Sequence, residues 1–196
     1  MPTVDTTDGL RIREQRAADH DAVVSVVGRA FSDDPDVVPL EAELATLEGS
    51  SAYVAELDAD VVGHVRLTRS WIDAEQRLVD VLVLSPLSVE PRVQRTGIGR
   101  ALVARALTRA EEVGSPALFL EGDPAYYSRL GFRPAAELGV APPSRRVPAP
   151  AFQAVRLPAY EPWMTGALVY PDVFWRHDAV GLRGDRLAAV RRALGD

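Results

Sequence analysis

Residues 87–100 read LSVEPRVQRTGIGR, and this stretch carries the most informative pattern in the chain. A short segment, Leu87–Val89, leads into a turn with Gly97 and Gly99, and a helix follows to about Val113. Such a turn is a general anion-binding device, because the first backbone N–H groups of the helix lack partners and the helix dipole favours negative charge there. Glycine also removes the side chains where a phosphate must approach the backbone. The stretch therefore predicts a phosphate-binding turn.

Three classes of phosphate-binding turn can be compared with this stretch. The Walker loop needs a lysine after its last glycine, and all 22 basic residues of this chain are arginine, so nucleotide triphosphate hydrolysis is excluded. The dinucleotide-binding fingerprint needs a third glycine or alanine, and Leu102 occupies that position. The third class is the pyrophosphate turn of acyl-CoA-binding proteins.

Hydrophobic periodicity outlines the remaining elements. Sequence patterning predicts strands at Leu10–Arg13, Ser51–Leu57, Val61–Thr68 and Arg77–Leu84, and a final strand pair at Phe152–Leu157 and Thr165–Tyr170. The nearly all-apolar run Ala117–Glu121 predicts a short strand that is central and buried. Helical spacing and caps predict helices from Asp19 as N-cap to about Phe31, at Leu40–Leu47, from Ile98 to about Val113, at Pro124–Leu130 and at Arg186–Leu194. The proline-rich run Ala135–Pro150 is predicted to be an extended crossing.

Two motifs resemble one known family. Residues Gln94–Gly99 (QRTGIG) reproduce the Q/R-x-x-G-x-G/A signature of the GCN5-related N-acetyltransferases (GNAT), and Gly122–Phe132 (GDPAYYSRLGF) resembles the second motif of a bacterial subgroup. The best-matching core covers about residues 10–134, within a single predicted domain of residues 1–196. The strand pair and helix of residues 150–196 complete that domain.

The resemblance implies a mixed α/β fold with a central, mostly antiparallel, twisted sheet that is flanked by helices and splayed at two parallel strands. Acetyl-CoA is expected in the splay as cosubstrate. Pro86 fits this arrangement, because it lacks a ladder donor and favours a bulge or a frayed edge; the alternative is that it merely ends its strand.

The resemblance also implies roles for the residues around the glycine turn. The backbone of the strand is expected to pair with the pantetheine arm, and the turn is expected to hold the pyrophosphate. The strand residues are Leu87, Ser88 and Val89; the turn residues are Gln94, Arg95, Thr96, Gly97, Ile98, Gly99 and Arg100. Arg92, Arg95 and Arg100 would add positive charge.

Tyr127 is the candidate general acid. A phenol with a pKa near 10 can protonate a departing thiolate whose conjugate acid has a pKa near 8.5, as orders of magnitude, and stays protonated at neutral pH. Glu121 is a candidate general base, and Glu56 and His64 are alternatives. Asp123 stands near the position where many family members carry an asparagine that bonds the pantetheine; it would accept hydrogen bonds or cap the following helix.

Composition limits the function further. The chain has 196 residues, 47% of them hydrophobic, and a net charge of -6, which argues against nucleic-acid binding. Cysteine is absent, so a cysteine acyl-enzyme is excluded and a reducing cytoplasm is favoured. The first ten residues contain Asp5 and Asp8 and no apolar run, so a signal peptide is not predicted. No window of the sequence approaches the roughly 18 apolar residues that a membrane helix needs, so no membrane span is predicted. His20 and His177 have no partners at ligand spacing, and no metal is predicted.

These observations predict an N-acetyltransferase that moves an acetyl group from acetyl-CoA directly to a primary amine of a small molecule or peptide. A backbone N–H of the splayed strand would stabilise the oxyanion. The alternative is a catalytically silent acyl-CoA-binding sensor or regulatory module on the same fold. Exchange of a final strand between subunits is a predicted route to a homodimer.

Overall fold

The structure, a computed structural model, describes residues 9–195. The prediction made for Asp5 and Asp8 lies outside these residues. The described chain divides into two compact units, one with residues up to Thr68 and Leu84–Thr108, the other with Arg69–Val83 and residues from Arg109 onward. Both units contain parts of two long strands, β3 (Asp60–Asp73) and β4 (Leu78–Val89). The prediction of a single domain stays a prediction.

The first unit is built on antiparallel strands. The edge strand β1 (Arg11–Glu14) pairs with β2 (Ser51–Leu57), which pairs in turn with β3. The N–H of Glu90, directly after β4, donates to the carbonyl of Val62 in β3 over 2.8 Å. The predicted strands at 10–13, 51–57 and 61–68 are therefore confirmed, although β3 is longer than expected.

Strand β4 corrects one alternative. It begins at Leu78 and continues through Pro86 to Val89, so Pro86 does not end the strand. The predicted strand Arg77–Leu84 and the segment Leu87–Val89 thus belong to one strand.

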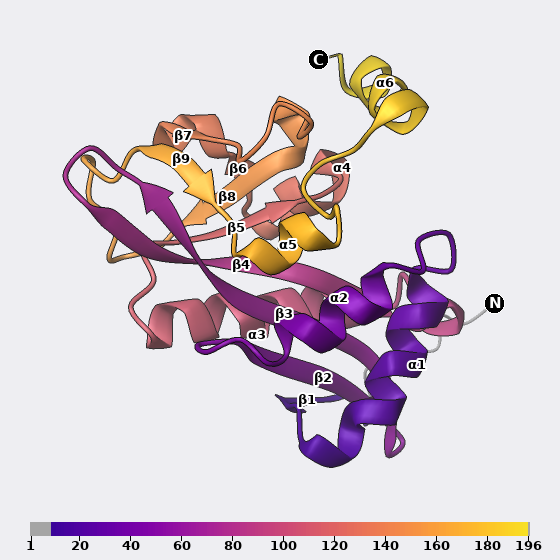
Figure 1. The fold of residues 1–196 in the computed structure, drawn as a ribbon. Helices are drawn as coiled ribbons and strands as arrows, with labels where there is room; N and C mark the ends of the chain where they lie inside the picture. Colours follow the sequence, from indigo (N-terminus) through magenta and orange to yellow (C-terminus); the bar gives the residue numbers. More distant parts are fainter. Residues whose placement is uncertain (1–8, 196) are drawn as a thin grey trace. The chain divides into compact units, whose positions relative to one another are not determined.

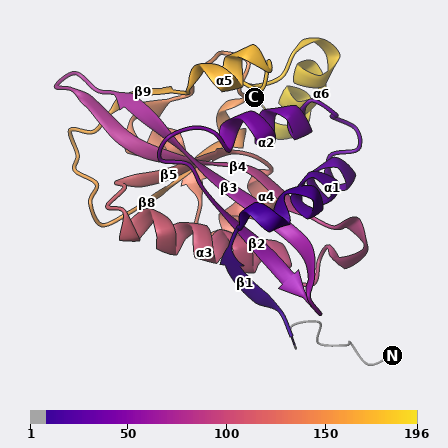
Figure 2. The same cartoon turned by 60° about the horizontal axis from the view of Figure 1, so that its bottom comes forward.

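Helices cover both faces of the strands in the first unit. Helix α3 (Ile98–Glu112) packs against β3 at Gly63, where a Cβ would lie 3.1 Å from Ile98 and 3.0 Å from Leu102. Helices α1 (His20–Ala30) and α2 (Val37–Leu44) lie on the opposite face, as Figure 1 and Figure 2 both show. The apolar stripe of α1 is confirmed, because Val23, Val26 and Val27 are buried. Helix α2 starts and ends three residues earlier than predicted.

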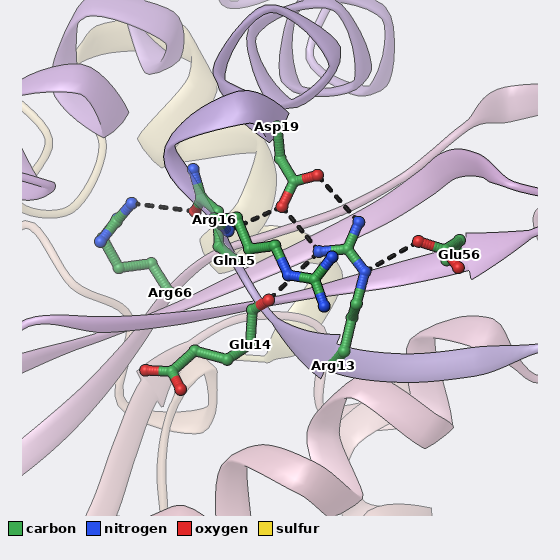
Figure 3. A network of polar contacts seen from close by, with 7 residues as sticks. All are labelled: Arg13, Glu14, Gln15, Arg16, Asp19, Glu56 and Arg66. Atoms are coloured by element: carbon green, nitrogen blue, oxygen red, sulfur yellow. Dashed lines mark hydrogen bonds and ion pairs between the residues drawn. The ribbon is translucent and has the colours of Figure 1, made fainter.

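The entry into α1 differs from the prediction. Asp19 has helical backbone angles and makes no side-chain cap hydrogen bond to α1. Its carboxylate instead accepts from the N–H of Arg16 over 2.7 Å and from both terminal nitrogens of Arg13 over 2.7 and 2.8 Å. Arg13 also donates to Glu56 over 2.8 Å (Figure 3). Asp19 is thus the residue that directly precedes α1, as predicted, but its carboxylate does not cap this helix: it closes the preceding 3₁₀ turn (Ala17–Asp19) and binds Arg13 of β1.

The second unit is built on β5 (Ala117–Glu121). This strand is fully apolar and buried except at Glu121, and it runs parallel to β4 with Leu82 beside Leu118 and Val83 beside Phe119. Its other edge pairs antiparallel with β8 (Phe152–Arg156), and β8 pairs with the short β6 (Arg133–Pro134). The prediction of a central buried strand at Ala117–Glu121 is confirmed.

The predicted final strand pair is wrong as a pair. Strand β9 (Gly166–Val169) does not join β8 but runs antiparallel to β3 and parallel to β7 (Val140–Ala141). Both strands exist, but each finds its partner in an element remote in sequence.

The segment Ala135–Pro150 is also more structured than predicted. It contains a 3₁₀ turn (Ala135–Leu138), strand β7 and the start of a second 3₁₀ turn (Ala149–Ala151). Helix α4 (Pro124–Tyr127) and a 3₁₀ turn (Ser128–Leu130) confirm the helical segment before Gly131. Helix α5 (Asp172–Arg176) was not predicted, whereas α6 (Gly184–Leu194) was.

The described elements confirm the predicted fold class. The strands form parallel and antiparallel pairs and are flanked by helices. The splay of two parallel strands stays a prediction. Among residues 9–195, no helix has the length and apolar character needed to cross a membrane.

Candidate functional site

The glycine turn leads from β4 into α3 and lies in the first unit. Gly97 has φ +99°, and a Cβ placed there would meet nothing within 4 Å. The turn is braced from behind, because the Thr96 hydroxyl donates to the carbonyl of Val93 over 2.7 Å and the Gln94 amide donates to that of Val89 over 3.1 Å. Arg95 has a left-handed φ of 64°. The sequence placed the turn correctly, and the structure gives the Gln94 side chain a bracing contact.

The surface of this turn carries positive charge. Arg92, Arg95 and Arg100 are exposed, and the 15 residues of α3 begin at Ile98, within the turn. The first N–H groups of a helix lack intrahelical acceptors, so the turn offers backbone donors and guanidinium groups together. Such a combination can hold a pyrophosphate.

An ion pair holds the start of the turn, and sequence reasoning missed it. Both oxygens of the buried Glu90 accept from the Arg29 Nε of α1, over 3.0 and 2.8 Å. Its backbone N–H is bound to β3 at Val62. Glu90 directly precedes the turn, but its partner is 61 residues away, so local spacing did not indicate the ion pair.

The strand that leads to the turn has two faces. Leu87 and Val89 are half-buried, and Ser88 between them is 1% exposed. The Ser88 hydroxyl has no hydrogen-bond partner among the described residues. No side-chain contact of these three residues assigns them to a ligand, and their predicted pantetheine contacts stay predictions.

Tyr127 belongs to the second unit and is the last residue of α4. Its ring makes an edge contact with Phe132, with centroids 5.6 Å apart, and with Tyr126 at 4.9 Å. Its N–H donates to the carbonyl of Asp123 over 3.1 Å. The Asp123 carboxylate accepts from the N–H of Ala125 over 2.8 Å and so caps α4, which confirms the capping role weighed for it.

Gly122 is a site residue that the motif contained but sequence reasoning did not use. A Cβ at this position would lie 2.8 Å from Tyr127 Cδ2 and closer still to Cε2. The Tyr127 ring therefore lies directly on the backbone at Gly122. The spacing of the motif, with glycine five residues before the second tyrosine, is the signal that could have shown it.

Burial raises the pKa of Tyr127 far above its ordinary value near 10, and the neighbouring Tyr126 and Asp123 raise it further. The phenol is therefore fully protonated at physiological pH, as a proton donor must be. A higher pKa also makes it a weaker acid, so proton transfer has to accompany the departure of a strongly basic thiolate.

Glu121 is half-buried at the end of β5. Its Oε1 accepts from the Tyr170 hydroxyl over 2.9 Å, and its Oε2 accepts from the N–H of Gly181 over 3.1 Å. Burial raises the pKa of Glu121 to about 7, although these two donors and the charge of Arg146 lower it. The carboxylate is thus already bound on both oxygens.

The two other base candidates, Glu56 and His64, lie in the first unit, and each is close to a charged side chain. Glu56 accepts from Arg13, as described above. His64 is completely buried, with Nε2 3.3 Å from Glu41 Oε1, and burial lowers its pKa to about 3. Glu41 is also bound by Arg66, whose Nε donates to both carboxylate oxygens over 2.9 and 2.8 Å. His64 is therefore neutral and buried, whereas Glu56, which is paired with Arg13, keeps 25% of its side chain exposed.

The described residues contain no group of three or more metal-ligating side chains. His20, on α1 in the first unit, is exposed, and His177, after α5 in the second, is half-buried.

Comparison with known proteins places these features in context. Residues 48–134 match the family described as an acetyltransferase (GNAT) domain. The chain is 29% identical to the uncharacterized N-acetyltransferase YjhQ of Escherichia coli (strain K12) over 106 residues. This match covers 54% of this chain and 59% of that relative. It spans about half the length of the curated relatives that it matches.

Two crystal structures are similar over most of the chain. One is a GNAT family N-acetyltransferase (YhbS) from Escherichia coli in complex with CoA, with a TM-score of 0.76, 27% identity, and coverage of 85% of this chain and 92% of that one. The other is a GNAT family acetyltransferase from Brucella melitensis in complex with acetyl-CoA, with a TM-score of 0.64, 25% identity, and coverage of 84% and 97%.

Proposed function

Because this chain belongs to the GCN5-related N-acetyltransferase superfamily, we propose that it transfers an acetyl group from acetyl-CoA to a primary amine of a small molecule or peptide. The observation that carries the proposal is the braced turn at Gly97, with a left-handed backbone, open space at its Cβ position and exposed arginines around it. The similar proteins crystallised with CoA and acetyl-CoA support the choice of cosubstrate.

The residues of the turn suit acetyl-CoA in charge and shape. Its pyrophosphate is anionic, and the turn offers the first N–H groups of α3 with Arg92, Arg95 and Arg100. The backbone of Leu87–Val89 would hold the pantetheine arm, and the backbone of residues 94–100 would hold the pyrophosphate. Acetyl-CoA supplies the activated acetyl group; the chain binds it and controls the protons.

Transfer is proposed to be direct, because the chain contains no cysteine to form a thioester intermediate. The amine nitrogen attacks the acetyl carbonyl carbon, the new C–N bond forms and the C–S bond breaks. The thiolate takes one proton, for which Tyr127 is the proposed donor, and the nitrogen loses one proton to a base or water. The products are the acetylamide and free CoA thiol, and the phenol regains its proton from solvent.

A turnover screen tests the function. The protein is incubated with acetyl-CoA and a panel of primary amines, namely polyamines, aminoglycosides, amino acids and peptides, and the release of CoA thiol is followed. Amine-dependent release supports the proposal. Tight binding of acetyl-CoA without release for any amine would favour the silent sensor instead. A homodimer and a cytoplasmic location remain part of the proposal.

A further inference from the structure

The carboxylate of Glu121 connects two parts of the second unit that are far apart in sequence. Tyr170, which donates to Oε1, is 49 residues away, and Gly181, which donates to Oε2, is 60 residues away. Both donors belong to the segment of residues 170–181, which includes α5. Glu121 itself is the last residue of β5, one position before Gly122. The two hydrogen bonds therefore tie the C-terminal segment to the end of a central strand.

The two residues that donate to Glu121, Tyr170 and Gly181, are closely packed. The Tyr170 side chain is buried, and its ring lies against Phe174 with centroids 4.7 Å apart. Gly181 has φ +69°, and a Cβ there would lie 2.5 Å from the carbonyl oxygen of Arg146. The next residue, Leu182, donates its N–H to that same carbonyl over 3.0 Å. Only glycine fits this position, and its N–H is aimed at Glu121.

On the other side, Glu121 is followed by Gly122, whose backbone lies against the Tyr127 ring. Gly122 donates its N–H to Ala151 over 2.9 Å and accepts from the Gln153 amide over 3.2 Å. The Tyr127 ring lies on the backbone of Gly122, and its N–H is bound to Asp123. The turn of residues 122–127 is therefore held at two places: by hydrogen bonds from Gly122 to Ala151 and Gln153, and by the carboxylate of the preceding residue, Glu121.

We propose that Glu121 is a positioning residue that ties the C-terminal segment of residues 170–181 to the turn carrying Tyr127, rather than the general base. The role in catalysis rests on the function proposed above, whereas the tie itself can be measured without activity. Each oxygen of this carboxylate already accepts one hydrogen bond from residues 170–181, and these two bonds fix the orientation of the carboxylate toward that segment.

The charges around Glu121 give the tie a pH dependence. The groups that face it are the Tyr170 phenol, the N–H of Gly181 and the guanidinium of Arg146, which is 3.1 Å from Asp178. Its partners across β8, Phe152 and Gln153, are uncharged. Burial raises the pKa of Glu121 from 4.5 to about 7, so the tied state holds its proton more tightly than a released state with a hydrated carboxylate. Rising pH therefore favours release, by about tenfold between pH 6 and pH 8.

Two substitutions at Glu121 separate positioning from base catalysis. In Glu121→Gln, the side-chain oxygen can accept from Gly181 and the NH₂ can donate to the Tyr170 oxygen, so the tie persists without charge. We expect kcat within about threefold of native, whereas loss of a general base would cost about 10²- to 10⁴-fold. In Glu121→Ala the tie is lost, and we expect kcat to fall about tenfold with an unchanged KM for acetyl-CoA.

Amide hydrogen exchange measures the tie itself, at the N–H groups of Gly181 and Tyr127. The ratio of native to Glu121→Gln rates cancels the intrinsic pH dependence of exchange and should rise about tenfold from pH 6 to pH 8. Glu121→Ala should exchange faster at both amides. If this variant does not fold, Tyr170→Phe, which removes one donor, should show the same direction at Gly181. The exposed Glu137→Gln is the matched control and should behave as native.

Three results would overturn the proposal. A Glu121→Gln protein with native exchange rates and a kcat reduced a hundredfold would make Glu121 the base. Unchanged exchange at both amides in Glu121→Ala and in Tyr170→Phe would remove the tie. Faster exchange at Gly181 alone would show that the tie does not reach Tyr127. If the native protein acetylates no amine, the proposed function fails, while the exchange rates still decide the tie.

Discussion

At the scale of single residues, Tyr127 offers the most direct test of the proposed chemistry. Phenylalanine keeps the ring contacts with Tyr126 and Phe132 but removes the hydroxyl proton. If that proton goes to the thiolate, kcat should fall by about 10²- to 10⁴-fold in Tyr127→Phe. The affinity for acetyl-CoA should change by less than about 1 kcal/mol, because the lost interaction belongs to the transition state. Steady-state kinetics with an accepted amine, beside calorimetry, check both values.

Tyr126→Phe is the control for this experiment. Tyr126 is the neighbouring tyrosine, it is 39% exposed, and no proton transfer is proposed for its hydroxyl. This variant should keep near-native kcat. A folded Tyr127→Phe protein with near-native kcat would contradict the assignment of the acid.

The pH profile gives a second residue-scale prediction. Burial raises the pKa of Tyr127 far above its ordinary value near 10, so the phenol is expected to remain protonated up to about pH 10. The native kcat profile should therefore show no alkaline decrease that disappears in Tyr127→Phe. Rate measurements up to about pH 10 check this. A native alkaline limb near pH 10 that the variant lacks would mean that the phenol is more hydrated than its burial indicates.

Gly122 provides a test of packing at the same site. A methyl group at this position would lie 2.8 Å from Tyr127 Cδ2 and closer still to Cε2, so the ring or the turn has to move. Gly122→Ala should lower the free energy of unfolding by about 1–3 kcal/mol. In a Tyr127→Ala background the same change should cost much less, because the ring is gone. Urea denaturation of the four proteins of this cycle measures the coupling.

At the scale of elements, the turn between β4 and α3 can be compared with the other end of the same helix. Gly97 and Gly114 both have left-handed φ, +99° and +70°, and at both positions an added Cβ meets nothing within 4 Å. A β-branched residue should therefore cost a similar backbone strain, about 1–3 kcal/mol, at either end. Only Gly97→Val should also weaken acetyl-CoA binding, by about 2 kcal/mol or more.

Calorimetry on the folded Gly97→Val and Gly114→Val proteins makes this comparison. Equal affinities for acetyl-CoA in the two variants would mean that the pyrophosphate does not bind at the turn.

The ion-pair network of β1 predicts a stability effect that depends on pH. Arg13 lowers the pKa of Asp19 from 3.8 to about 2, chiefly through the hydrogen bonds drawn in Figure 3. A lowered pKa contributes stability that is present above pH 4 and is lost as the pH falls toward 2. Asp19→Asn should cost about 1–2 kcal/mol at pH 7 and little at pH 2, after allowance for partial exposure. Urea titrations at both pH values, with the exposed Asp21→Asn as control, measure the difference.

The same network shows which features of the elements could be predicted from sequence. Periodicity located β2, β5, α3 and α6 closely, because each buries one regular face or a continuous apolar run. Asp19 occupies the predicted position before α1, but its carboxylate binds Arg13, which lies on a strand, instead of capping the helix. Local spacing in the sequence does not predict whether a side chain binds a local or a tertiary partner.

Strand partners were harder to predict than strands. Alternation identified β8 and β9, but β8 pairs with β5 and β9 pairs with β3, because pairing depends on which apolar faces the whole unit brings together. Strand β7 has only two residues and carries no period at all. For the candidate site, the motifs gave the turn and Tyr127, whereas the partners of Glu121 and Glu90 come from residues 49 to 61 positions away.

At the scale of the whole molecule, ligand-linked stability distinguishes binding from catalysis. A ligand that binds only the native state raises the free energy of unfolding by about 2.7 kcal/mol at a concentration of 100 times Kd. Acetyl-CoA and CoA should therefore both raise the melting temperature in a concentration-dependent manner, and this shift should be much smaller in Gly97→Val. Because pyrophosphate recognition does not involve the acetyl group, the two ligands should stabilise the protein to a similar extent.

The same measurement in Tyr127→Phe separates an acetyltransferase from a silent acyl-CoA sensor. In an acetyltransferase, this variant should keep the full melting shift with acetyl-CoA while losing turnover, because the phenol proton acts only as the C–S bond breaks. In a sensor, the native protein would already show the shift without turnover for any amine, and Tyr127→Phe would change neither quantity. A melting shift that depends on the Tyr127 hydroxyl would instead indicate that this residue binds the thioester in the ground state, which would replace its role as acid.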